Sequence, residues 1–161
     1  MHEWNDYILE VMNMLNFYGT TGHKTHILQF TTGDMLLEGI QAVIDRENIK
    51  NAFLTSGLGT LDRCRMHYVA SIGFPAQDVM QTWMDEPIGI AAMSGIIANG
   101  QPHIHMVIST YSGESKTYTG HLEEGCRVLY RVEMIIQEIE DLELTRVSNE
   151  NGIEVLSNKA R

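Results

Sequence analysis

The chain has 161 residues, of which 43% are hydrophobic and 20% charged, a composition typical of one soluble globular domain. No stretch approaches the roughly 18 consecutive apolar residues of a membrane-spanning helix, so we expect no transmembrane segment. The 21 Asp and Glu outnumber the 11 Lys and Arg, and the resulting charge of -10 argues against tight binding to nucleic acid.

The first 22 residues are expected to form an N-terminal helical extension. Apolar residues recur at spacings of three and four between residues 3 and 18, and glycines follow at positions 19 and 22. This period predicts an amphipathic helix over 3–18. Because the chain begins with acidic residues where a secretion signal needs basic ones, we also expect a cytoplasmic protein.

A second helix is predicted from Met35 to Glu47. Asp34 precedes it and can cap the free N–H groups of its first turn. The buried stripe of this helix is expected to consist of Leu36, Leu37, Ile40, Val43 and Ile44.

The rest of the chain is dominated by short segments with β-branched or alternating apolar residues, separated by Gly, Asn or Pro. The predicted strands are 26–31, 51–56, 63–71, 88–98, 103–111, 116–120 and 142–148. The fold class is therefore α+β, dominated by a sheet. Residues 127–139 fit the period of a strand and that of a helix, so periodicity leaves this segment open.

Two cysteines, Cys64 and Cys126, are too few for a disulfide framework and lack the C-x-x-C spacing of a redox or metal motif. We expect buried free thiols, as is usual in a reducing compartment. The sequence therefore indicates no disulfide.

The clearest functional feature is the spacing of three of the seven histidines. His103 and His105 are two positions apart in a predicted strand, so their side chains share one face. A turn at Ser112–Gly113 could bring His121, on the next predicted strand, beside them. Three neutral imidazoles with an open fourth position are typical of a catalytic or ligand-exchanging zinc site. The alternative is that these histidines only cover a solvated face.

The other histidines, at positions 2, 23, 26 and 67, lack such spacing and are expected to be surface or hydrogen-bonded polar residues. His67 differs from the other three, because Arg63 and Arg65 would share its strand face. Since protonation competes with metal binding, any bound metal should be lost as the pH falls through the histidine range, near about 6.

Five sequence blocks occur in a fixed order and spacing. They are 32–38 (TGDMLLE), 55–61 (TSGLGTL), 93–97 (MSGII), 102–105 (PHIH) and 120–126 (GHLEEGC). In this order and spacing they resemble the PPC domain, named for its occurrence in plants and prokaryotes. The resemblance covers about residues 25–148, so we divide the chain into an extension (1–22), a PPC-like domain (23–148) and a C-terminal tail (149–161).

The resemblance implies a compact antiparallel sheet flanked by helices, a homotrimer, and a strand over 127–139. In plants the domain accompanies AT-hook motifs, but this sequence contains no Arg-Gly-Arg-Pro hook. The only closely spaced basic residues are Arg63, Arg65, Arg127 and Arg131. We therefore expect at most weak DNA binding.

The wider fold is similar to that of acetolactate decarboxylase, in which a His-x-His pair and a later histidine hold zinc. The three spaced histidines of this chain match those ligands. A decarboxylase would also need a carboxyl group to protonate the enolate, for which Glu123 and Glu124 are candidates. It would further need an arginine to hold the substrate carboxylate, for which Arg63 and Arg65 are candidates.

The preferred interpretation is a homotrimeric PPC-domain protein with a three-histidine zinc-type site that binds a small anionic molecule. One alternative is a metal-dependent lyase, which requires an acid and an arginine within reach of the open metal position. The other is a DNA-binding regulatory protein, which requires a continuous basic face.

Overall fold

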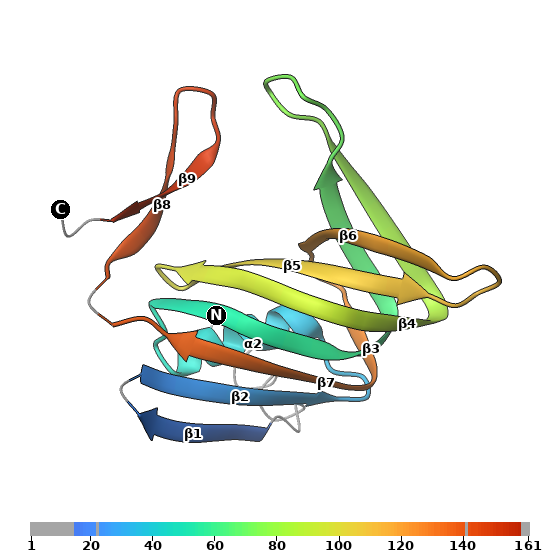
Figure 1. Ribbon diagram of the computed structural model, residues 1–161, viewed down its shortest axis with the longest axis horizontal. Coiled ribbons are helices and arrows are strands. Elements are labelled where there is room, and N and C mark those ends of the chain that lie inside the picture. The colour runs from blue at the N-terminus through green and yellow to red at the C-terminus, as the bar shows by residue number, and fades with distance from the viewer. Residues whose placement is uncertain (1–14, 22, 141, 159–161) are drawn as a thin grey trace, which may run out of the picture.

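The computed structural model describes residues 15–21, 23–140 and 142–158 of the chain. Its main body is a seven-stranded antiparallel sheet in the order β1-β2-β7-β3-β4-β5-β6 (Figure 1). These strands are β1 (Leu15–Thr21), β2 (His23–Thr31), β3 (Asn51–Val69), β4 (Asp78–Ala98), β5 (Gln101–Thr110), β6 (Lys116–Leu122) and β7 (Arg127–Glu138). A helix, α2 (Leu36–Arg46), joins β2 to β3, and β8 (Leu144–Ser148) pairs with β9 (Glu154–Asn158) in a separate hairpin.

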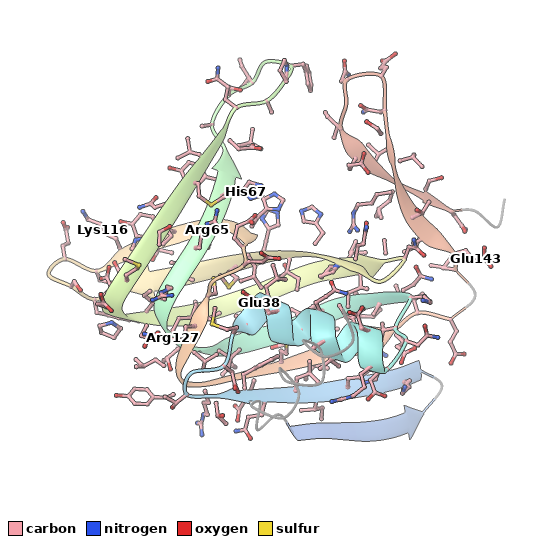
Figure 2. All side chains as sticks on the ribbon, turned by 180° about the vertical axis from the view of Figure 1, so that it is seen from behind. Glu38, Arg65, His67, Lys116, Arg127 and Glu143 are labelled. Atoms are coloured by element: carbon pink, nitrogen blue, oxygen red, sulfur yellow. The ribbon has the colours of Figure 1, made fainter. Side chains whose placement is uncertain are left out.

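The sheet closes on itself at one end. β6 pairs with β5 along one edge and with β3 along the other, through Met66 opposite Leu122 and His67 opposite His121. The strands β3, β4, β5 and β6 therefore form a closed ring. The outer halves of β3 and β4 continue as a projecting arm, on the same side of the sheet as the β8–β9 hairpin (Figure 1, Figure 2).

The apolar stripe of α2 packs against the sheet. Leu36, Ile40, Val43 and Ile44 are buried in the same core as the inward side chains of the strands, which confirms the predicted helix and most of its stripe. Leu37 is only partly buried. The core thus occupies the space between α2 and one face of the sheet.

The prediction that Asp34 caps the helix α2 is wrong. The Oδ2 atom of Asp34 accepts a hydrogen bond from the backbone N–H of Thr31 at 2.6 Å, so this carboxylate closes the turn after β2. Met35 is the N-cap residue, and it makes no side-chain capping bond. It is extended and forms a bridge with Arg127, which delays the start of the helix until Leu36.

Of residues 127–139, which periodicity left open, all but the last form the strand β7 (Arg127–Glu138). This strand lies between β2 and β3 and pairs with both, so its backbone groups are satisfied from two sides. Pairing with distant strands thus decides between strand and helix for this segment, which its hydrophobic period could not do.

The predicted N-terminal helix falls mostly on residues 3–14, which lie outside the described residues. Its last part is wrong, because residues 15–18 belong to β1 and pair with β2, from Leu15 opposite Gln29 onward. Within the described ranges α2 is the one helix, so the fold is more sheet-dominated than two flanking helices would make it. No helix in this part of the chain has the length and apolar character to cross a membrane.

Two further expectations concern the cysteines and the C-terminal segment. Cys64 and Cys126 are buried and free, as predicted. The segment expected to be a tail after residue 148 contains β9, which returns along β8.

Candidate metal centre

Four histidines gather on one face of the ring where β3, β6 and β5 lie side by side. His121 of β6 is opposite His105 of β5 and opposite His67 of β3. Residues directly opposite each other on paired strands share a face, and His103 lies two positions from His105 on that same face. The closure of the ring by β6 is therefore what brings the histidines together.

Two glycines allow the strands to approach closely at this point. A Cβ atom at Gly120 would lie 2.6 Å from the carbonyl oxygen of His67, and one at Gly95 would lie 2.4 Å from the carbonyl oxygen of His103. Both contacts are far inside normal separation. The close approach of β6 to β3 therefore requires glycine at position 120, next to His121. The close approach of β4 to β5 likewise requires glycine at position 95.

The predicted set of three histidines converges. Ring nitrogens of His103, His105 and His121 lie within 4.8 Å of one another. The ring centroids of His105 and His121 are 4.1 Å apart, and those of His103 and His121 are 4.6 Å apart. Because zinc–nitrogen bonds are about 2 Å long, two ligands of one ion lie within about 4 Å of each other. Three imidazoles also fit the donor set of zinc.

The electrostatics of the cluster favour neutral imidazoles. Burial lowers the pKa of His121 to about 4, with further lowering by His105, His67 and His103 and a smaller opposing effect of Asp78. Burial also lowers the pKa of His103. A neutral imidazole is the form that binds a metal ion, so the cluster is ready to bind one near neutral pH.

His67 lies beside the three converging histidines without joining them. Its ring stacks on that of His121 with centroids 4.0 Å apart, and its Nδ1 is hydrogen-bonded to a carboxylate oxygen of Glu123. His67 lies two residues before the outer end of β3, in the projecting arm (Figure 2). His67 therefore contacts the His121 ring on one side and a carboxylate on the other.

Of the candidate acids and bases, the glutamates lie near the histidines. Glu123 and Glu124 line a cavity of about 320 Å³ together with His103 and His121. Arg63 and Arg65 are absent from the lining of this cavity, although the sequence made them candidates for holding a substrate. Both residues precede His67 on β3, and Arg65 lies two positions from it on the same strand face.

Two residues that the sequence did not single out also face the cluster. Glu38, near the start of α2, lines the same 320 Å³ cavity, and its Oε1 accepts a hydrogen bond from the backbone N–H of Gly125 at 2.9 Å. Its Oε2 is buried without a hydrogen bond in the described part of the chain. Arg146 of β8 lines a second cavity, of about 570 Å³, with His103 and His105. Arg146 has no local sequence signal, whereas Glu38 ends the block 32–38, which indicated the family but not a place beside the histidines.

Comparison with known proteins identifies the domain. The model of the Plants and Prokaryotes Conserved (PCC) domain, the family called PPC above, matches residues 18–140. The chain belongs to this family. The match includes all seven strands of the main sheet in whole or in part, and it ends before the β8–β9 hairpin.

Similar proteins within and around the PCC family are distant in sequence. The bifunctional protein GlmU of Synechococcus sp. (strain JA-2-3B'a(2-13)) is 20% identical over 123 residues, 76% of this chain, and the chain spans only 18% of its length. A metal-containing protein from Archaeoglobus fulgidus is 20% identical, with a TM-score of 0.69 over 88% of this chain and 96% of its own. A structure from Bacteroides thetaiotaomicron named "putative dna binding protein" is 15% identical, with a TM-score of 0.68 over 88% of this chain and 96% of its own. These structures show that the fold is shared.

Proposed function

We propose that this PCC domain binds one divalent metal ion through His103, His105 and His121 and holds a small anionic molecule at the position they leave open. The observation that carries the proposal is the convergence of three ring nitrogens within 4.8 Å on one face of the sheet. The lowered pKa of His121 supports it, because the imidazole stays neutral well below pH 7.

Zinc suits this donor set best. Three nitrogen ligands leave one tetrahedral position for water or for an oxygen of a bound molecule, and a bound zinc ion would polarise that oxygen. The name of the Archaeoglobus fulgidus relative, a metal-containing protein, is consistent with a metal in this fold. A lyase reaction is a further hypothesis, for which Glu38, Glu123 and Glu124 are carboxyl groups in the cavity beside His103 and His121 that could move a proton.

Metal analysis tests the proposal directly. Purified protein is incubated with zinc near pH 7.5, freed of excess ion and analysed by mass spectrometry of the metal. We expect about one zinc per chain, and a strong loss in His103→Ala, His105→Ala and His121→Ala. Gln101→Ala, an exposed change at the start of the same strand β5, is the matched control and should keep its zinc. Unchanged zinc content in all three histidine variants would refute the site.

DNA binding is the second candidate, favoured by the name of the Bacteroides thetaiotaomicron relative. The basic residues of this chain are partly neutralised by acidic neighbours. Arg127 donates two hydrogen bonds to Asp62, at 2.8 and 2.9 Å, and Arg131 lies 3.9 Å from Glu133. We expect no binding of duplex DNA tighter than micromolar at about 150 mM salt, as measured by fluorescence anisotropy. Sub-micromolar affinity would make DNA the preferred partner.

We also propose that the chain assembles as a homotrimer, as the family resemblance implies. The arm formed by β3 and β4 supports this, because large apolar side chains are exposed near its tip, including Ile72 and Phe74. Sedimentation analysis should give a trimer that Phe74→Asp weakens. Tyr130→Asp, at an exposed position on β7, is the control. A wild-type monomer at micromolar concentration would contradict the proposal.

A further inference from the structure

The β8–β9 hairpin places one arginine over the histidine cluster. The guanidinium of Arg146 donates hydrogen bonds to two backbone carbonyls of the main sheet, that of Gln101 at 3.0 Å and that of Ile96 at 3.1 Å. These bonds connect the hairpin to β4 and β5. They also fix the position of the guanidinium at the edge of the sheet from which His103 and His105 project.

One face of the β8–β9 hairpin and two of the histidines line the same cavity. Arg146 is opposite Leu156, and Glu154 is opposite Ser148, so alternate positions along both strands share this face. A cavity of about 570 Å³ lies between this face and the sheet. Its lining residues are Leu54, Ser94, Gly95, Ile96, His103, His105, Arg146, Glu154 and Leu156.

The guanidinium keeps donors for a ligand. Arg has five N–H groups, and the two carbonyl bonds occupy one on each terminal nitrogen, which leaves three. Burial lowers the pKa of Arg146 from its ordinary value, yet a guanidinium of this kind remains charged at neutral pH. Its charge also helps to lower the pKa of His103, which shows that the field of Arg146 reaches the cluster.

We propose that Arg146 forms a carboxylate-binding subsite beside the three histidines, so that a small carboxylate with a further oxygen is held by both. The carboxylate would accept hydrogen bonds from the free N–H groups of Arg146, and the further oxygen would face the position open on the metal. This inference rests on the proposed function for the second contact only. It replaces Arg63 and Arg65 with Arg146 as the arginine that recognises the ligand.

Glu154 sets the strength of this subsite. Its carboxylate lies in the same cavity and raises the pKa of Arg146, so it attracts the guanidinium that the ligand must reach. An anionic ligand therefore competes with Glu154 for Arg146 and is repelled by the same carboxylate. Removal of this charge should tighten anion binding.

The test uses the full-length, zinc-loaded chain and pyruvate as the probe, with binding measured by calorimetry. We expect a dissociation constant in the millimolar range or tighter, weakened about tenfold or more in Arg146→Gln, because a charge-assisted hydrogen bond is lost. Glu154→Gln should bind pyruvate more tightly than the wild type. Arg131→Gln, which removes the same charge from an exposed position on β7, is the control and should bind as the wild type does.

Methyl pyruvate, which lacks the carboxylate charge, shows whether Arg146→Gln removes charge recognition or distorts the whole cavity. This neutral ester should bind equally to the wild type and to Arg146→Gln. Because Arg146 also holds the hairpin, the tightening in Glu154→Gln is an independent measure that does not disturb the two carbonyl bonds. Equal pyruvate affinity in Arg146→Gln and wild type, equal affinity in Glu154→Gln, or no pyruvate binding to the wild type would overturn the inference.

The same experiments distinguish the subsite from the metal centre. If the wild type holds no zinc, the proposed function fails. Pyruvate binding by the metal-free protein that still depends on Arg146 would then uphold the carboxylate subsite. If zinc is bound in full and pyruvate binding ignores Arg146, the metal centre stands and the subsite falls.

Discussion

Replacement of Gly120 by alanine tests whether the close contact between β6 and β3 positions His121. The added Cβ would lie 2.6 Å from the carbonyl oxygen of His67, 0.8 Å less than the 3.4 Å at which ordinary contact begins. Backbone oxygen cannot rotate away as a side chain can. Either β6 moves outward by several tenths of an ångström or β3 does, and His121 is the next residue along β6.

The loss of folding free energy caused by this shift can be estimated from the overpacking it produces. Overpacking of a well-packed site costs about 1–3 kcal/mol, which for a domain of this size is a fall in melting temperature of about 2 to 12 °C. We therefore expect Gly120→Ala to be less stable in urea unfolding and to bind zinc more weakly, because the three ring nitrogens no longer converge.

Gly73→Ala is the matched control for this substitution. No heavy atom lies within 4 Å of a Cβ at Gly73, and its backbone does not have a positive φ. It should leave stability and zinc affinity unchanged within about 0.5 kcal/mol. If Gly120→Ala behaves like Gly73→Ala in both measurements, the close approach of β6 to β3 does not hold the site together.

Three other outcomes can be measured on the same protein. Zinc should be retained to a lower pH than the histidine range near about 6 that the sequence suggested, because burial lowers the pKa of His121 to about 4 and also lowers the pKa of His103, and only a protonated ring rejects the metal; release that follows the ordinary histidine pKa would refute this. Glu138→Ala should lower the free energy of unfolding by about 1–3 kcal/mol in urea without changing zinc content, since it removes the 2.7 Å hydrogen bond of the fully buried His26. Removal of zinc with a chelator should lower the melting temperature, because an ion at about 100 times its dissociation constant adds about 2.7 kcal/mol of stability, whereas identical melting with and without zinc would exclude tight binding to the folded state.

The sequence by itself determined the features that depend on local period. Residues two apart in a strand must share a face, so the pairing of His103 with His105 follows from spacing alone. The three-to-four residue period of α2 likewise predicted which of its side chains enter the core. The order of the five sequence blocks indicated the domain family, because such motifs record a whole fold rather than one element.

The tertiary structure decided everything that depends on contacts between distant segments. Segment 127–138 is a strand because β2 and β3 pair with it on both sides, and residues 15–18 are a strand because β2 is their neighbour. Arg146 reaches the histidines only because the β8–β9 hairpin folds back over β4 and β5. The two Arg146 bonds join residues 45 and 50 positions apart in the sequence, where neither spacing nor propensity carries information about which segments will meet.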